Sequence, residues 1–246
     1  FTYRQDIAAI PPSKDEDSYY FELGLIGNNP CVDLIVTDYP GERLQDDPDY
    51  VSKKIEESEI VIIAIDAPYV MEQGGAYNEE KNQIALTTKF ITDNIDSFEN
   101  KLVMLVPLKC EKYLDLYAVE KRNDRSNEMT TRIISLYGKM VTELKRKGNV
   151  ALVVAPILTV GGVIFDRFEV VNNLHVAKYR FYDGITSDGS QARYSPRFCA
   201  QPIFYLLSFV AQKYKRHRNS AGLIGAMFKT LAAFPDEIPG LYTQDK

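Results

Sequence analysis

Cysteine and histidine are scarce in this sequence, and their scarcity excludes a covalent or metal-held framework. The 246 residues include three cysteines, Cys31, Cys110 and Cys199, and two histidines. An odd and widely spaced set of cysteines does not form a disulfide framework, and two histidines leave no metal-ligand cluster of the usual spacing. We therefore expect a reducing, cytoplasmic setting and a fold that depends on its apolar core.

An excess of positive charge and long apolar runs are also lacking. The net charge is −5, which argues against a general nucleic-acid binder, so we expect no nucleic acid among the partners. No apolar run approaches the roughly 20 residues that a membrane helix requires, so we expect no membrane span. These absences leave a globular protein, 45% hydrophobic, with enough apolar residues for a large core.

Apolar runs alternate along the chain with helix-like periodicity. Three runs are apolar on both faces, as buried strands are: residues 60–65, 102–107 and 150–154. Apolar residues at helical spacing separate these runs, over about 76–98 and then from Ile133 to Leu144. This order predicts an α/β fold, a mostly parallel sheet with helices on both faces.

The segments on either side of this core predict smaller units. Strand-like runs at residues 19–25 and 31–37 flank a turn-rich connector, which predicts an antiparallel hairpin with one strand in the sheet. Residues 161–195 are interpreted as a hairpin and loop insertion, and residues 196–246 as C-terminal helices. We interpret residues 1–246 as a single domain.

The first residue is Phe1, and no helix or strand signal opens the chain. We therefore expect a domain that is truncated at its amino end. Residues upstream would then help to complete a functional site.

A strand that runs into the turn Asp38-Tyr39-Pro40-Gly41-Glu42 carries the strongest functional signal. An Asp at the end of a strand can hold Mg2+ through water, and a Gly can offer an unshielded backbone N–H to a terminal phosphate. The same Asp-x-x-Gly pattern also describes an ordinary turn after a strand. The pattern predicts a phosphate-binding turn, with the plain turn as its alternative.

Polar residues follow the next apolar strands in a related way. Lys109 and Glu111 come after the strand at 102–107, and Ala155 comes after the strand at 150–154. A carboxylate there could accept two hydrogen bonds from guanine, and the lysine could lie along the base and sugar. The alternative is a pair of solvated loop charges. We interpret Asp66, which ends the strand at 60–65, as a turn-former.

This order of hairpin, Asp-x-x-Gly turn, strands and base-reading loop resembles the Ras-like P-loop GTPases over about residues 13–157. The segment Pro196-Arg197-Phe198-Cys199-Ala200-Gln201-Pro202 is similar, more specifically, to bacterial double-GTPase-type proteins. The resemblance implies Ras-like GTPase architecture with GTP or GDP and Mg2+ as ligands.

Residue roles follow from the same resemblance. It implies that Asp38 is the Mg2+-side carboxylate, Gly41 the γ-phosphate sensor, and Lys109 with Glu111 the guanine reader. Ala155 would offer its backbone N–H to the base carbonyl. Ser13 stands roughly where the family has its Mg2+-binding switch threonine.

The sequence departs from the family pattern at three places. No Gly-x-x-x-x-Gly-Lys-Ser/Thr phosphate loop occurs in it. Glu42 replaces the Gln that orients the attacking water, so the catalytic position carries a negative charge that repels a γ-phosphate. Leu108 replaces Asn or Thr, and Glu111 is one methylene longer than Asp. Hydrolysis would then be slow or use another group, and base selectivity would be weaker.

The sequence thus supports two functional hypotheses. The first is a guanine-nucleotide-binding molecular switch that hydrolyses GTP to GDP if the intact protein supplies the upstream phosphate loop. The alternative is a pseudo-GTPase, an interaction scaffold without nucleotide turnover. Either predicts a protein partner. A Rossmann-like enzyme would require a glycine-rich fingerprint, which is absent.

Overall fold

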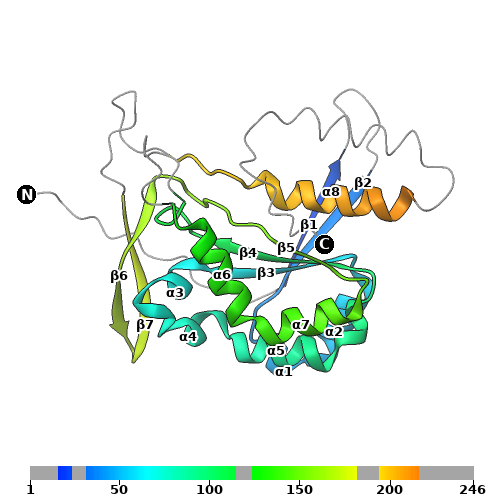
Figure 1. The fold of residues 1–246 in the computed structure, drawn as a ribbon, viewed down its shortest axis with the longest axis horizontal. Coiled ribbons are helices and arrows are strands. Elements are labelled where there is room, and N and C mark those ends of the chain that lie inside the picture. Colours follow the sequence, from blue (N-terminus) through cyan, green and yellow to red (C-terminus); the bar gives the residue numbers. More distant parts are fainter. Residues whose placement is uncertain (1–15, 24–31, 115–123, 182–193, 216–246) are drawn as a thin grey trace, which may run out of the picture.

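The computed structural model describes residues 16–23, 32–114, 124–181 and 194–215, with side chains as far as residue 213. Its strands form a three-stranded parallel sheet and two separate antiparallel hairpins (Figure 1). The α/β class and the parallel core are therefore confirmed. The elements are β1 (Asp17–Leu23), β2 (Val32–Asp38), α1 (Arg43–Asp46), α2 (Pro48–Glu57), β3 (Ile60–Asp66), α3 (Ala67–Met71), η1 (Gln73–Gly75), α4 (Asn78–Asn82), α5 (Ile84–Asp93), η2 (Ile95–Phe98), β4 (Leu102–Leu108), α6 (Ser126–Leu136), α7 (Gly138–Lys147), β5 (Ala151–Val154), β6 (Val163–Val171), β7 (Leu174–Phe181) and α8 (Ala200–Lys215).

The parallel sheet has the order β3-β4-β5, with β4 in the centre. The first six residues of β4 are all buried, as the continuous apolar run predicts. Register pairs Ile60 with Leu102 and Asp66 with Leu108, so β3 and β4 end at the same edge. That shared carboxyl edge is where ligands bind in parallel sheets.

Helices cover both faces of this sheet, as predicted. Side chains of α2, α5, α6 and α7 pack with Val103 and Leu105 on one face in the largest apolar cluster. Tyr205 and Phe209 of α8 pack over Met104 on the opposite face. Figure 1 shows α8 on one side of β3 and β4, with α2, α5 and α7 on the other. The core is thus a three-layer α/β arrangement.

The hairpin β1–β2 forms as predicted, with Asp17 opposite Asp38. The sequence placed one hairpin strand in the main sheet. In the part of the chain that the structure describes, however, β2 pairs only with β1, and β3 pairs only with β4. Ras-like architecture is therefore not confirmed, and it stays a proposal.

The single helix expected over 76–98 is divided in the structure. α4 ends at Asn82, and Gln83 takes a left-handed conformation with φ of 45° before α5 begins at Ile84. A second break separates α5 from the 3-10 turn η2. Apolar periodicity alone does not reveal these breaks because it continues across them.

Local signals explain where other helices start and stop. The side chain of Asp47 accepts a hydrogen bond from the Tyr50 backbone N–H at 3.2 Å, and Pro48 fills the first turn of α2. α7 ends at Gly148, whose φ of 75° suits glycine. α8 forms within residues 196–246, where C-terminal helices were predicted, and the rest of that range, from residue 216, lies outside the described residues. No helix among the described residues combines the length and apolarity needed to cross a membrane.

Truncation of the central strand should test this core. Leu105 is fully buried, so Leu105→Ala should lower the free energy of unfolding by about 2–5 kcal/mol through lost burial and a residual cavity. Urea unfolding followed by circular dichroism would measure the change. Leu136 on α6 is 42% exposed, so Leu136→Ala is the matched control and should change stability by about 0.5 kcal/mol or less. Equal losses in the two variants would contradict this assignment of the core.

Candidate functional site

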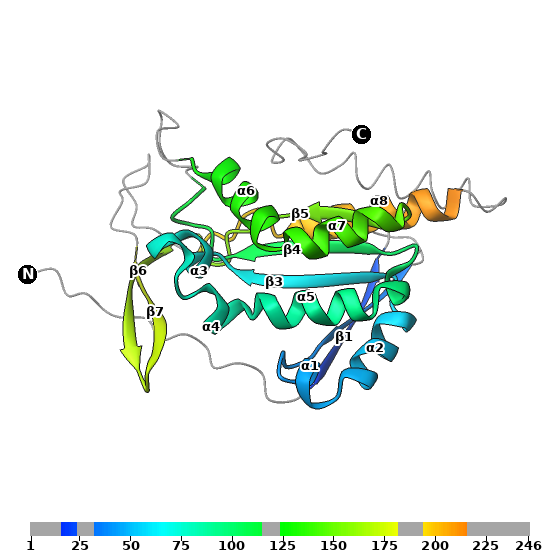
Figure 2. The same ribbon diagram turned by 60° about the horizontal axis from the view of Figure 1, so that its bottom comes forward.

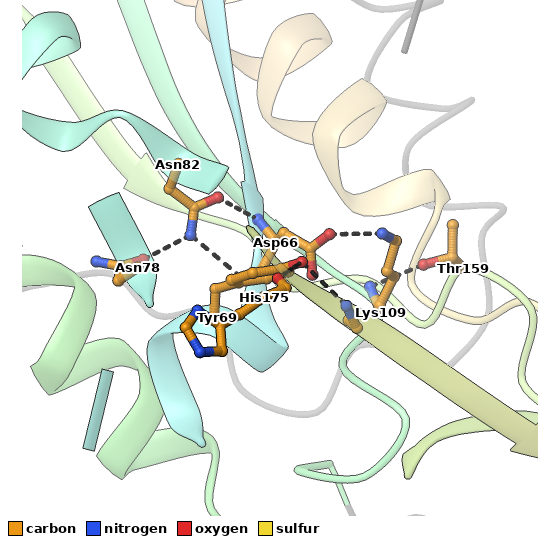
Figure 3. Close-up of polar contacts among 8 residues, drawn as sticks. Asp66, Tyr69, Asn78, Asn82, Lys109, Thr159 and His175 are labelled. Carbon is orange, nitrogen blue, oxygen red and sulfur yellow. Dashed lines mark hydrogen bonds and ion pairs between the residues drawn. The ribbon is translucent and has the colours of Figure 1, made fainter. Parts of the chain in front are cut away.

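The carboxyl edge of the parallel sheet carries a buried ion pair. Lys109, just after β4, places its Nζ 2.5 Å from Oδ2 of Asp66, which ends β3 (Figure 3). The Asp66 side chain is only 8% exposed, while the Lys109 side chain is 34% exposed. A carboxylate buried to this degree requires a charge partner, which Lys109 supplies from the neighbouring strand.

Asp66 is also held through its backbone. Its N–H donates to Oδ1 of Asn82 at 2.8 Å, and its carbonyl accepts from Nδ2 of Asn82 at 3.2 Å. Asn82 Nδ2 also donates to Oδ1 of Asn78 at 2.6 Å (Figure 3). These bonds join α4 to the end of β3 and hold the backbone at Asp66 in place.

One oxygen of this carboxylate lies close to a second buried polar group. Asp66 Oδ1 is buried, and so is the hydroxyl of Tyr179 on β7. Burial raises the pKa of Tyr179, and the charge of Asp66 and a side-chain hydrogen bond with Asp66 raise it further, so this hydroxyl keeps its proton. The protonated hydroxyl of Tyr179 and the Asp66 carboxylate thus offer each other a donor and an acceptor.

Backbone geometry sets the position of Lys109. Its φ is 58°, a left-handed conformation that costs a non-glycine residue roughly 1–2 kcal/mol. Its N–H donates to Oγ1 of Thr159 at 2.8 Å. Its Nζ lies 5.2 Å from the centroid of the Tyr179 ring. Such a strained residue at the end of a strand is typical of functional sites.

Glu111 lies at the same edge, but its carboxylate accepts hydrogen bonds from the protein backbone. Its Oε1 accepts hydrogen bonds from the N–H groups of Val160 and Gly161, at 2.7 and 3.1 Å. Ala155 is fully buried, and its N–H donates to the Leu105 carbonyl at 2.9 Å. Glu111 thus organises the loop after β5, and the Ala155 N–H belongs to the sheet ladder.

The loop that Glu111 binds is tightly packed. A Cβ on Gly161 would lie 2.0 Å from the Ser195 carbonyl oxygen, and φ at Gly161 is 80°. Both the close approach and the left-handed backbone require glycine at this position. The Ser195 N–H donates to the Val160 carbonyl at 2.8 Å, which fixes the segment leading to α8.

Asp38 and Gly41 lie at the carboxyl end of β2, and both are exposed. A Cβ on Gly41 would come within 4.0 Å of Oε1 of Gln83, the residue that follows Asn82. The two turn residues and Asn82 also line one shared cavity. The Asp38 turn therefore lies at the same edge as Asp66. Glu42 is exposed and precedes α1, and its side chain makes no capping bond there.

The structure thus brings most of the predicted residues to one edge, in order from Asp38 and Gly41 to Lys109 and Glu111. Ser13 lies outside the described residues. Sequence reasoning missed Asp66, which it took for a turn residue. Its signal was present, because Asp66 ends an apolar strand as Asp38 does, at the edge where parallel sheets bind ligands.

The hairpin β6–β7 covers this edge. Tyr69 of α3 donates its hydroxyl hydrogen to the His175 carbonyl at 2.8 Å and accepts from the Ala177 N–H at 3.0 Å. Tyr69, Phe165, Ala177 and Tyr179 form an apolar cluster beside the ion pair. This packing excludes solvent from Asp66 and strengthens its attraction to Lys109.

A second polar contact fastens the hairpin to α4. His175 stacks on Tyr77 with ring centroids 3.5 Å apart, and its Nδ1 lies 2.9 Å from Oε1 of Glu80. The His175 backbone N–H donates to Oε2 of Glu80 at 2.9 Å. These hydrogen bonds hold the pKa of Glu80 below its ordinary value of 4.5.

The site contains no reactive thiol and no ready-made metal cluster. Burial raises the pKa of the Cys110 thiol, whose Sγ lies 3.3 Å from the Pro107 carbonyl, so the thiol stays protonated and inert. Across the described ranges, no three His, Cys, Asp or Glu side chains are placed to hold a metal ion. The chemistry that remains is electrostatic: carboxylates, one lysine and backbone N–H groups at a sheet edge.

The ion pair can be tested by removing one partner. Lys109→Met should lower the free energy of unfolding by about 1–3 kcal/mol, because it leaves the Asp66 carboxylate buried without a cation. The double variant Lys109→Met with Asp66→Asn should recover part of that loss, since no buried charge then remains. Urea unfolding would measure both. A double variant with the summed losses of two independent single variants would contradict the coupling.

The Glu80–His175 contact predicts a dependence on pH. Because folding depresses the pKa of Glu80, the contact should stabilise the protein above pH 4.5 and lose its effect as pH falls through the lower folded pKa. Glu80→Gln should therefore lower the melting temperature at pH 6, and its difference from the parent protein should shrink as pH falls below 4.5. Glu79→Gln is the control, because it removes the same charge from the neighbouring residue and leaves the Glu80–His175 contact in place. If Glu80→Gln lowers the melting temperature by the same amount at pH 6 and below pH 4.5, the titration of Glu80 is not the cause.

Comparisons were made with protein-family models, curated proteins and solved structures. None of the three finds a match to this chain. Function is therefore inferred from the geometry of the sheet edge.

Proposed function

We propose that this domain binds a guanine nucleotide with Mg2+ along the carboxyl edge of its sheet and acts as a nucleotide-dependent switch. The observation that carries this proposal is the common edge of the strand-end residues. Asp38 and Gly41 approach Asn82 and Gln83, Asn82 bonds to Asp66, and Asp66 pairs with Lys109. A nucleotide laid along this edge would have its phosphates near Gly41 and its base near Lys109 and Glu111.

The end of the proposed site at Asp38 and Gly41 is suited to a phosphate with Mg2+. Asp38 is exposed, and no hydrogen bond of its side chain is found within the described ranges, so it could accept from water on the metal. One or two carboxylates with phosphate oxygens and water suffice for Mg2+. The exposed Gly41 has no side chain to shield its N–H from a phosphate. Mg2+ would neutralise phosphate charge there when bound.

The end of the proposed site at Lys109 and Glu111 is suited to guanine, but it offers fewer contacts. Lys109 is partly exposed and could turn from Asp66 toward a nucleotide. Oε1 of Glu111 accepts hydrogen bonds from two backbone N–H groups, which leaves Oε2 for a ligand. A single free oxygen could accept one guanine N–H, so we expect a modest preference over adenine.

Hydrolysis of GTP to GDP belongs to the proposal only if the intact protein supplies a phosphate loop. Glu42 is exposed near the phosphate end and carries the charge that repels a γ-phosphate. Slow turnover with a long-lived bound state would follow, which suits a switch that orders the turn at Gly41.

One observation favours a second candidate, the interaction scaffold without turnover. Lys109, Glu111 and the Ala155 N–H are all engaged within the protein. Residues that satisfy each other need no nucleotide to be stable. In this alternative the edge is purely structural and the domain acts through protein contacts.

Calorimetry with GDP, a non-hydrolysable GTP analogue and ADP, with and without Mg2+, would separate the two candidates. We expect both guanine nucleotides to bind, with Mg2+ strengthening the GTP analogue. Asp38→Asn should weaken Mg2+-dependent binding about tenfold, which corresponds to roughly 1.4 kcal/mol.

Asp33→Asn is the matched control, because Asp33 is exposed at the opposite end of β2. It removes the same charge and should leave nucleotide affinity unchanged. Absence of binding by all three nucleotides would overturn the proposal and leave the scaffold.

A further inference from the structure

The hairpin β6–β7 is joined to the rest of the domain by side chains and not by the sheet. Among the described residues its two strands pair only with each other, with Val163 opposite Phe181 and Val171 opposite Leu174. Figure 2 shows the hairpin at one end of the molecule, next to α3 and α4 and apart from α2 and α7. A two-stranded hairpin is marginally stable by itself in water, so these side-chain contacts decide whether it stays in place.

Two side chains bind the outer edge of β7. The Tyr69 hydroxyl of α3 accepts a hydrogen bond from the Ala177 N–H at 3.0 Å and donates one to the His175 carbonyl at 2.8 Å. Glu80 of α4 accepts from the His175 N–H at 2.9 Å. Alternate residues of a strand present their backbone groups on the same side, so Tyr69 and Glu80 act on one edge. These side chains take the place of a neighbouring strand.

Two lysines of the loop after β4 lie against aromatic rings of the hairpin. Lys109 Nζ is 5.2 Å from the centroid of the Tyr179 ring, and Lys112 Nζ is 4.9 Å from the centroid of the Phe165 ring. Each lysine also pairs with a carboxylate outside the hairpin, and each side chain is about one-third exposed. If the hairpin lifts, both lysines keep their carboxylates and exchange an aromatic ring for water, so little electrostatic stabilisation is lost.

Apolar contact holds the hairpin only in its middle. An apolar cluster there packs against Tyr69. Val170, near the turn, is 66% exposed, and Phe181, at the other end, is 51% exposed. A segment with few buried apolar contacts opens more readily than the core of its domain.

The loop that leads into β6 is anchored independently of the hairpin. Glu111 accepts hydrogen bonds from the N–H groups of Val160 and Gly161, and the Ser195 N–H donates to the Val160 carbonyl. None of these four residues belongs to β6 or β7, so the bonds remain when the hairpin moves. The loop can therefore serve as the pivot about which the hairpin lifts.

The hairpin in its observed position blocks the Asp66 carboxylate. The Asp66 side chain is 8% exposed, and the Tyr179 hydroxyl of β7 offers it a hydrogen-bond donor. Lys109 contacts both of these residues. A ligand along the sheet edge could reach Lys109 only from its exposed side and could not reach Asp66.

We propose that the hairpin β6–β7 is an autoinhibitory lid, which lifts as a unit from α3 and α4 and uncovers Asp66 and Lys109. The lifting is a property of the chain alone, whereas its effect on affinity rests on the proposed nucleotide site. In the closed form the strand-end residues satisfy one another, and in the open form Lys109 can turn to a ligand. Because the open form alone is competent to bind, the apparent dissociation constant is the intrinsic constant divided by the open fraction.

Hydrogen exchange of the full chain without nucleotide tests the lid. The reporter is the His175 amide, which bonds to Glu80 and not to Tyr69. Tyr69→Phe removes the hydroxyl and keeps the ring, so the hairpin should open more often and the His175 amide should exchange about tenfold faster. Exchange at the Leu105 amide of β4 should not change, because the core stays folded.

A second variant loosens the hairpin at a different place. Lys112→Gln removes the cation beside Phe165 and leaves the outer edge of β7 as it is. If the hairpin lifts as a unit, this change should also speed exchange at His175, by about two- to fivefold.

Each variant has a matched control. Tyr137→Phe removes a buried hydroxyl that makes no hydrogen bond among the described residues. Lys89→Gln removes an exposed cation from α5, where it pairs with Asp93. Neither control should change exchange at His175.

Calorimetry with GDP tests the inhibition. Tyr69→Phe should bind GDP up to about tenfold more tightly than the parent chain, in proportion to its larger open fraction. Tyr137→Phe should bind as the parent chain does.

Unchanged exchange at His175 in Tyr69→Phe would overturn the lid, and so would equal acceleration at His175 and Leu105, which indicates global unfolding. Acceleration by Tyr69→Phe without any by Lys112→Gln would show fraying of one edge instead of lifting. If Tyr69→Phe exchanges faster but binds GDP no more tightly than the parent, the lid is not inhibitory. If neither chain binds GDP, the proposed nucleotide site is wrong, and the exchange measurements alone decide whether the hairpin lifts.

Discussion

The Asp66–Lys109 ion pair is the interaction on which the arrangement of the sheet edge depends. It joins the ends of β3 and β4, and Asn82 extends the network to α4. The hairpin β6–β7 can pack over this edge only because the charge of Asp66 is compensated there. Tyr179 of β7 lies close enough to Asp66 for the charge of this carboxylate to raise the pKa of the tyrosine. The ion pair and the hairpin thus act on the same carboxylate.

The sequence predicted the helices and strands better than the breaks between helices and the contacts between distant segments. The apolar run of β4 and the hairpin β6–β7 follow from local patterns and were found where predicted. The breaks at Gln83 and after Asp93 were missed, because apolar spacing continues across them. Among the site residues, Asp38 and Lys109 were placed at strand ends correctly. The engagement of Glu111 by two backbone N–H groups of a distant loop has no local signature.

By itself the sequence determined the α/β class, the parallel core and the polar residues at the strand ends, since periodicity and strand boundaries are local properties of a chain. Only the tertiary structure decided that Asp66 pairs with Lys109 and that Glu111 binds its own chain. It also decided that β2 and β3 stand apart with unpaired edges within the described ranges. These features join residues that are far apart in sequence, and their energies depend on burial and mutual distance, which no local pattern encodes.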